Sequence, residues 1–104
     1  MSAIESTTWP NKYTVERVTA EFDFTKDLAA GDSLVSVQLV VTTVAGVDVA
    51  PLAVLFGAAQ IKGARVFQQL HGGLPGCSYR IECRATTADN NLLLLARVLP
   101  VVAI

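Results

Sequence analysis

Apolar and polar residues alternate in steps of two along most of this chain, and that periodicity constrains the fold more than any other feature. Between positions 77 and 87, Tyr79, Ile81, Cys83 and Ala85 alternate with polar or charged residues. Successive side chains of an extended strand point to opposite faces, so this pattern predicts a strand with one buried face. A 3.6-residue helical period is weakly present only around 50–60. The sequence therefore predicts an all-β domain.

Turn residues divide the chain into six or seven short strands. The predicted strands cover residues 14–24, 34–44, 53–56, 64–71, 77–87 and 92–99, and Pro100 is expected to end the last of them. Their inward faces are expected to carry Val18, Ala20, Phe22, Phe24, Val35, Val37, Leu39, Val41, Val66, Gln68 and Leu70. Short strands with turns every 8–12 residues favour a two-sheet sandwich.

A turn before the cleanest strand narrows the fold class. Tyr79 begins that strand three residues after Gly76, in a turn that also contains Pro75. This spacing is typical of a tyrosine corner, in which the hydroxyl bonds to upstream backbone and fixes the crossover of a Greek-key sandwich. The alternative is an ordinary inward-facing tyrosine of another β fold. We therefore predict an immunoglobulin-like Greek-key β-sandwich of about seven strands over residues 13–100, with an extended N-terminal arm, 1–12, and a C-terminal tail, 101–104.

Catalytic and metal-binding patterns are weak. The single histidine, His71, precedes two glycines and reads as a loop residue, and no G-x-S-x-G nucleophile motif occurs. Cys77 and Cys83 lie about 20 Å apart on one predicted strand, too far for a disulfide, and are expected to be small core residues. One histidine and two cysteines at this spacing also lack the close pairing of zinc ligands. We expect no catalytic residue, metal or cofactor.

Two carboxylates share one face of the first predicted strand. Glu21 and Asp23 would lie about 7 Å apart, a spacing from which a glycosidase pair could be imagined. Neighbouring acids on a solvated strand face are the commoner explanation. Arg17 and Lys26 are expected to neutralise them.

The charge balance and hydropathy limit the partners. A net charge of −1, with the basic residues scattered along the chain, argues against nucleic-acid binding. The longest apolar stretch, 92–104, is too short for a membrane helix and contains Arg97 and Pro100. No secretory signal pattern opens the chain. The expected partners are therefore proteins.

Apolar residues are in surplus, and both ends carry part of that surplus. Hydrophobic residues make up 52% of the chain, more than a small core requires. Trp9 lies in the predicted arm, and no charged residue follows Arg97. The strand 92–99 is apolar on both faces except at Arg97, so its outer face is expected beneath a second protein or the chain's own arm. Trp9 either anchors a neighbouring subunit or folds back onto its own sandwich. The predicted interface residues are Ile4, Trp9, Leu93, Leu95, Leu99, Val101, Val102 and Ile104.

The order of several motifs resembles a family of small proteins of tailed bacteriophages. These motifs are E-F-D-F-T-K-D-L-A-A-G-D-S-L-V-S-V, D-V-A-P, Q-Q-L-H-G-G-L-P-G-C-S-Y-R-I and a final L-P-V, and together they cover roughly residues 13–102. The family is that of phage fiber-tail adaptor proteins with an immunoglobulin-like sandwich. The resemblance implies a structural virion protein on the tail, made in the host cytoplasm. It would be present in several copies and join a tail or neck protein (an adaptor or nozzle) to a tail fiber.

Other functions remain open at this stage. A capsid decoration (cementing) protein would use the same fold, because fold alone does not fix function. An immunoglobulin-like module for host or carbohydrate recognition would need an exposed aromatic platform, and Phe22, Phe24 and Tyr79 are assigned to strand faces. A small hydrolase is the weakest of the candidates.

Overall fold

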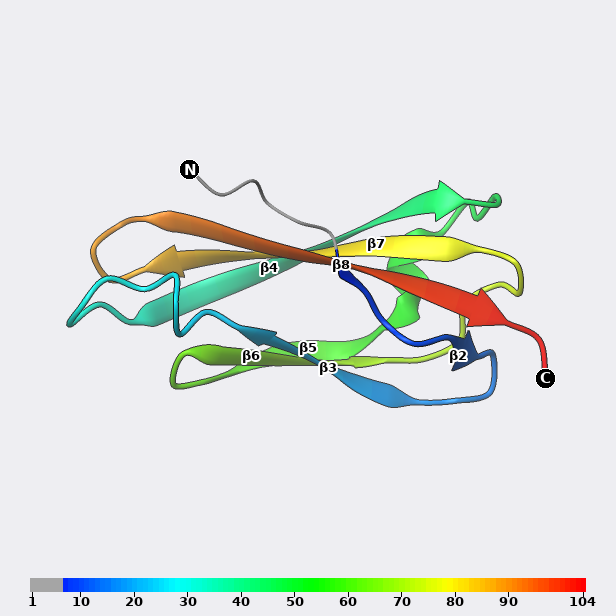
Figure 1. The fold of residues 1–104 in the computed structure, drawn as a ribbon, viewed down its shortest axis with the longest axis horizontal. Helices are drawn as coiled ribbons and strands as arrows, with labels where there is room; N and C mark the ends of the chain where they lie inside the picture. The colour runs from blue at the N-terminus through cyan, green and yellow to red at the C-terminus, as the bar shows by residue number, and fades with distance from the viewer. Residues whose placement is uncertain (1–6) are drawn as a thin grey trace.

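The computed structural model describes residues 7–104 as a two-layer β structure (Figure 1). Its elements are β1 (Thr7–Thr8), β2 (Lys12–Tyr13), β3 (Val18–Asp23), β4 (Leu34–Ala45), the 3₁₀ helix η1 (Pro51–Val54), β5 (Leu55–Lys62), β6 (Arg65–Leu70), β7 (Ser78–Thr87) and β8 (Leu92–Val102). No α-helix occurs in the described part of the chain.

The long strands form two sheets that face each other. One sheet has the order β8-β7-β4, with β1 and β2 pairing in parallel along the outer edge of β8, and the other has the order β3-β6-β5. Figure 1 shows the two layers stacked with their strands roughly aligned. The predicted all-β sandwich is confirmed. Successive strands divide between the layers in the order expected of immunoglobulin-like domains, so the topology is consistent with that finer class.

The core lies between the sheets and follows the predicted alternation. On β7, Tyr79, Ile81, Cys83 and Ala85 are fully buried. The facing sheet contributes buried side chains from β3 and β6, together with Phe24 just after β3. These are Ala20, Phe22, Phe24, Val66, Gln68 and Leu70. The period-two pattern alone thus predicts most of the inward faces, without knowledge of which strands pair.

Strand β4 departs from its predicted inward face at one position. Val41 is buried, and Val37 and Leu39 pack against the core, but Val35 is 60% exposed. The pairing of β4 with β7 shifts between Leu34 and Ser36, so strict alternation does not hold across that step. The expectation that Val35 faces the core is therefore wrong.

Three predicted strand boundaries also differ. The first long strand begins at Val18 rather than at residue 14, because Tyr13 and Glu16 close a turn through the Glu16 N–H donating to the Tyr13 carbonyl at 3.0 Å. Residues 51–54 form η1 rather than the start of a strand, and Pro51 at its first turn presets the helical φ angle. Strand β5 then runs from Leu55 to Lys62.

Pro100 lies inside β8, so the expectation that it ends the strand is wrong. Strand β8 continues to Val102, with Pro100 opposite Ser78. The backbone groups of the next residue make the hydrogen bonds there: the Val101 N–H donates to the Cys77 carbonyl, and the Val101 carbonyl accepts from the Gly76 N–H, both at 2.9 Å. Proline has no backbone N–H, and it is tolerated here because its neighbour Val101 makes the hydrogen bonds to the adjoining strand. The predicted tail, 101–104, therefore begins within a strand.

The two ends of the sandwich hold different connections. Strands β4 and β8 end, and β7 begins, at the end that also holds η1, β2 and residues 71–77; this is the loop end, on the right in Figure 1. The opposite end, the turn end, holds the short connections 24–33, 63–64 and 88–91. The molecule extends 45 Å along its longest axis.

Candidate interaction surfaces

Tyr79 fixes the loop end through its buried hydroxyl. The Leu74 N–H donates a hydrogen bond to Tyr79 Oη at 2.8 Å, which confirms the predicted bond to upstream backbone. The hydroxyl itself donates to Asp48 Oδ2 at 2.7 Å, a partner that the sequence did not reveal. One side chain thus ties together the loop before β7, which contains Pro75 and Gly76, and the loop between β4 and η1.

The hydrogen bond between Tyr79 and Asp48 favours the neutral phenol and the ionised carboxylate. Burial raises the pKa of Tyr79 to about 12, and the neighbouring Asp48 carboxylate adds to the shift. The pKa of Asp48 is lowered, first by the N–H of Ala50, which donates to Oδ1 at 2.9 Å, and then by the Tyr79 hydroxyl. At neutral pH the phenol is therefore a proton donor and the carboxylate an acceptor.

Two glycines allow the loops to approach the core closely. A Cβ built on Gly73 would lie 2.9 Å from Val101 Cγ2, and the φ of Gly73 is +89°. A Cβ on Gly46 would lie 2.6 Å from Cys77 Sγ, also with a positive φ. Both positions require glycine for space as well as for conformation. The loop end is thus closely packed beneath its exposed surface.

Lys12 connects the N-terminal arm to the same loop. Its side chain is buried, and Nζ donates to the Gly72 carbonyl at 2.7 Å and to the Tyr13 carbonyl at 2.9 Å. Desolvation lowers the pKa of Lys12, and the nearby Glu16 carboxylate partly opposes that shift. Lys12 was predicted as part of the arm without a role. Two carbonyl acceptors satisfy its ammonium, which is how a buried lysine is normally tolerated.

The arm itself folds back onto the sandwich. Trp9 packs edge-on against Phe22, with ring centroids 5.7 Å apart, and the backbone N–H of Trp9 donates to the Val98 carbonyl at 2.8 Å. Of the two alternatives for Trp9, the structure shows the intramolecular one. Because β1 and β2 pair along the edge of β8, the described part of the arm, residues 7–12, lies along that edge.

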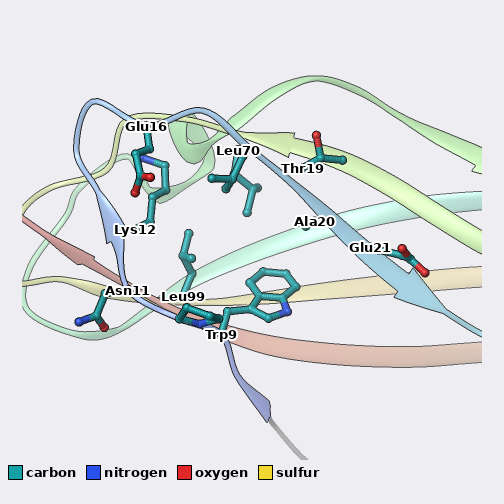
Figure 2. A pocket seen from close by; sticks show the side chains of 11 residues that line it. Trp9, Asn11, Lys12, Glu16, Thr19, Ala20, Glu21, Leu70 and Leu99 are labelled. Carbon is teal, nitrogen blue, oxygen red and sulfur yellow. The ribbon is translucent and has the colours of Figure 1, made fainter.

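A groove of about 330 Å³ lies between the arm and β3 (Figure 2). Trp9 and Leu99 line one part of it, and Lys12 and Glu16 lie at its far end. Its walls combine apolar side chains with the polar rim residues Thr19 and Glu21.

The predicted interface residues fall into three groups. Leu99 and Val101 are almost completely buried in the molecule's own core, so their side chains are covered within the chain itself. Leu93, Leu95 and Trp9 pack partly against that core. Val102 is half-buried, Ile104 is 85% exposed, and Ile4 lies outside the described residues. The apolar C-terminal sequence is therefore largely core, and Ile104 alone of the eight is strongly exposed among the described residues.

Exposed large hydrophobic side chains gather at the loop end instead. Apart from Val35 and Leu92, all those that the described residues present lie there. We call this set the apolar end: Tyr13, Val15, Val44, Val47, Val49, Leu52, Phe56, Leu74 and Ile104. The most exposed are Val49, at 97%, and Val47, at 81%. Exposed apolar side chains gathered at one end of a domain make that end a candidate for contact with another protein.

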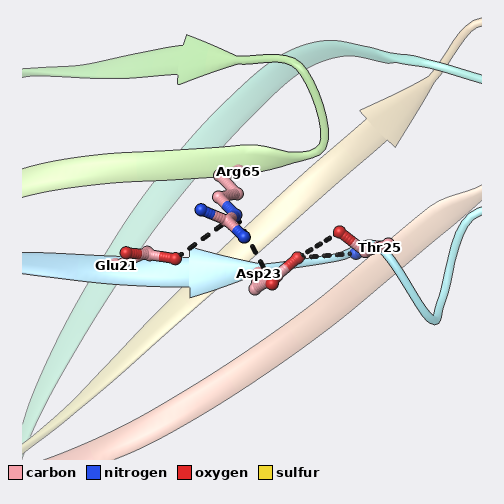
Figure 3. Close-up of polar contacts among 4 residues, drawn as sticks. All are labelled: Glu21, Asp23, Thr25 and Arg65. Carbon is pink, nitrogen blue, oxygen red and sulfur yellow. Dashed lines mark hydrogen bonds and ion pairs between the residues drawn. The ribbon is translucent and has the colours of Figure 1, made fainter.

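The predicted carboxylate pair is a surface ion pair with a different partner. Arg65 Nε lies 3.5 Å from an oxygen of Glu21 and 3.5 Å from an oxygen of Asp23 (Figure 3). Arg65 comes from β6, directly opposite Asp23, and the pairing of β3 with β6 brings it there. Of the two cations predicted from sequence neighbours, Lys26 acts on Asp23 in the same direction as Arg65 but more weakly, whereas Arg17 lies over the ring of Phe56. Asp23 also accepts from the backbone and hydroxyl of Thr25, and the hydroxyl bond is the main cause of its lowered pKa.

The two cysteines and the histidine considered from the sequence take part in packing and backbone contacts. Cys77 and Cys83 are buried free thiols, and burial raises the pKa of Cys83 to about 12. His71 follows β6. Its backbone N–H donates to the Val54 carbonyl, and the centroid of its ring lies 4.7 Å from that of the Phe56 ring. Within residues 7–104, no group of three or more histidine, cysteine or acidic side chains is placed to hold a metal ion. The same residues contain no helix long and apolar enough to span a membrane.

These features define a small β-sandwich with a groove beside its N-terminal segment and exposed apolar side chains at its loop end. A family model places the chain more narrowly: the model described as podophage GP4 fiber-tail adaptor protein gp77 matches residues 12–97. The chain belongs to this family, a structural component of phage tails. No curated protein matches the chain.

Proposed function

We propose that this chain is a structural adaptor that attaches tail fibers to the tail or neck of a short-tailed phage, without catalysis. The observation that carries the proposal is the family match over residues 12–97, most of the chain. In this role several copies, made in the host cytoplasm, are built into each virion tail and contact a tail or neck protein on one side and a fiber on the other.

The apolar end supports this role as one of the two docking surfaces. Its exposed side chains, Val47 and Val49 among them, stand on loops that the Tyr79–Asp48 bond holds in place. Lys12 braces the same region from the arm through the Gly72 carbonyl. Preorganised apolar surface binds with a small loss of conformational entropy, which suits a permanent assembly.

The experiment removes the chain from the virion and then restores single variants. Phage with an early stop codon in this gene are complemented with the normal chain, with Val49→Asp at the apolar end, or with Leu92→Asp as the matched control at the turn end. Leu92 is 71% exposed, so both substitutions place a carboxylate at an exposed apolar position. Negative-stain microscopy counts the fibers on each particle, and immunoblotting measures how much of the chain is incorporated.

Particles without the chain are expected to lack fibers, and Leu92→Asp is expected to restore them. Val49→Asp is expected to reduce incorporation or fiber number at least tenfold, because the buried charge would lack a partner. Particles that keep normal fibers without the chain refute the adaptor role. If those particles instead have fragile heads, the chain is a capsid decoration protein. If Val49→Asp and Leu92→Asp restore fibers equally well, the apolar end is not a docking surface, and the adaptor role itself is not affected.

A further inference from the structure

Strand β4 leaves one of its edges unpaired. It is the last strand of the order β8-β7-β4, and in residues 7–104 the backbone hydrogen bonds within its sheet join it to β7 alone. Half of the backbone N–H and C=O groups along an edge strand point away from the sheet, where they can pair with another strand. The outward groups of β4 therefore form a template for one more strand.

The other edges of the sandwich are protected, and that of β4 is not. The outer edge of β8 is occupied by β1 and β2. Edge strand β3 carries Glu21 and Asp23, and β5 changes register between Phe56 and Gln60 and ends at Lys62. Charges and irregular pairing are the usual means of preventing association at an edge.

The residues of β4 lack these protective features along its middle. The strand has 12 residues, L-V-S-V-Q-L-V-V-T-T-V-A, with neither a charged residue nor a proline. Its two register shifts lie near its ends, and Ser36 to Thr43 pairs without interruption with β7. The middle of β4 is thus regular, uncharged and rich in β-branched residues, all of which favour adding a strand.

We propose that the free edges of β4 from two copies of this chain pair antiparallel about a two-fold axis at Val40. Opposite residues in an antiparallel pair share one face of the sheet, so the match can be checked position by position. On the outer face Val40 meets Val40 of the second copy, and Gln38 meets Thr42. On the inner face Leu39 meets Val41. These three central pairs are uncharged and matched in polarity, and the next pairs outward, Val37 with Thr43 and Ser36 with Val44, are uncharged as well.

The contact is expected to be small. A strand of 12 residues is about 40 Å long and a sheet about 10 Å thick, so the pairing buries on the order of 800 Å² in total. This is below the roughly 1,000 Å² of a stable specific interface, so a weak, transient dimer with an affinity no tighter than about micromolar is expected. The association goes beyond the proposed adaptor role and does not depend on which virion proteins the chain contacts.

The test uses two variants of opposite charge at the two-fold position. Val40 is half-buried on the outer face, opposite Glu82 of β7, whose carboxylate is paired with Arg80 and Arg84, so both variants place their charge beside a charged cluster outside the core. The full-length chain and its Val40→Lys and Val40→Glu variants are examined by sedimentation velocity between about 5 and 200 µM, and far-UV circular dichroism checks that each is folded.

The normal chain is expected to pass from monomer to dimer across this range. Each variant alone is expected to dimerise at least tenfold more weakly, because like charges meet at the axis, and an equimolar mixture is expected to restore dimers. A chain that stays monomeric at every concentration overturns the proposal. So do dimers that neither variant weakens, or variants whose weakened dimers the mixture fails to restore.

A cross-link gives a second, independent measurement. Val40→Cys is expected to form a disulfide-linked dimer under mild oxidation, because the two sulfurs face each other at the axis. Gln69→Cys, an exposed position on the central strand β6, is the matched control and is expected to remain monomeric. The native thiols are buried and do not compete. Equal cross-linking of the two variants would refute pairing through β4, whether or not the chain attaches fibers.

Discussion

Replacing Tyr79 by phenylalanine tests whether the buried hydroxyl holds the loop end together. The substitution keeps the ring in the core and removes the oxygen that accepts from the Leu74 N–H and donates to Asp48. A neutral hydrogen bond contributes about 1 kcal/mol and one to a charged group about 1.5–3 kcal/mol. Asp48 is partly exposed and regains water, so a loss of about 2–3 kcal/mol in the free energy of unfolding is expected.

Equilibrium urea unfolding measures this loss, and the chain carries its own probe. Trp9 is the single tryptophan and packs against Phe22, so its fluorescence reports on the folded sandwich. A loss of this size corresponds to roughly 8–24 °C in Tm for a domain of about 100 residues. Tyr13→Phe is the control: Tyr13 is 48% exposed, and its change should stay within about 0.5 kcal/mol. If Tyr79→Phe costs no more than Tyr13→Phe, the hydroxyl does not fix the loops.

Alkaline unfolding checks the same hydroxyl through its proton. The pKa of Tyr79 is about 12 in the folded chain, whereas an unfolded tyrosine ionises near 10. Between these values the unfolded state holds fewer protons than the folded state, so stability falls as pH rises. The stability of the normal chain should therefore decline from pH 10 to pH 12, and the decline should be shallower in Tyr79→Phe. Parallel curves for the two proteins would contradict this account.

Two further substitutions test the close approach of the loop and the packing of the arm. Gly73→Ala is expected to cost more than about 2 kcal/mol, because its Cβ would collide with Val101 at a positive φ. Gly76→Ala, which has the same backbone strain but open space, should cost about 1 kcal/mol, and equal losses in thermal melts would argue against the collision. Trp9→Ala is expected to cost about 2–3 kcal/mol in thermal unfolding monitored by circular dichroism, through lost contact with Phe22. An unchanged Tm would mean that the arm does not stabilise the sandwich.

The inward faces of the sandwich could be predicted because burial and backbone geometry share one period. Tyr79, Ile81, Cys83 and Ala85 are all buried as the alternation indicates. The period is broken at the register shift beside Val35, and a bulge of one extra residue has no sequence signal of its own. At Pro100 the period continues, since Leu99 and Val101 are both buried, and the error there was to take a proline, which costs the strand only one donor, as its end.

Contacts between distant segments could not be predicted from the sequence. Asp48 lies 31 residues from Tyr79, and Lys12 lies 60 residues from Gly72. Each pair forms only after the strands are ordered, and no local spacing announces it. Nothing in the sequence distinguishes the buried Lys12 from an exposed polar residue of the arm. Arg65 became the partner of Glu21 and Asp23 for the same reason, because strand pairing rather than sequence distance sets it.

The surplus of apolar residues has two destinations. The surplus suggested that both chain ends are covered by other proteins, yet Leu99 and Val101 complete the core, and Trp9 packs against it. Hydrophobic residues near the termini therefore stabilise this chain's own fold. Apart from Val35 and Leu92, the large exposed hydrophobic residues lie at the apolar end, where Val47 and Val49 are separated by Asp48. Because the Asp48 carboxylate is bound to Tyr79, the residue that positions these two valines is also anchored in the core. A loss of that bond should therefore weaken binding at the apolar end more than it weakens pairing along β4.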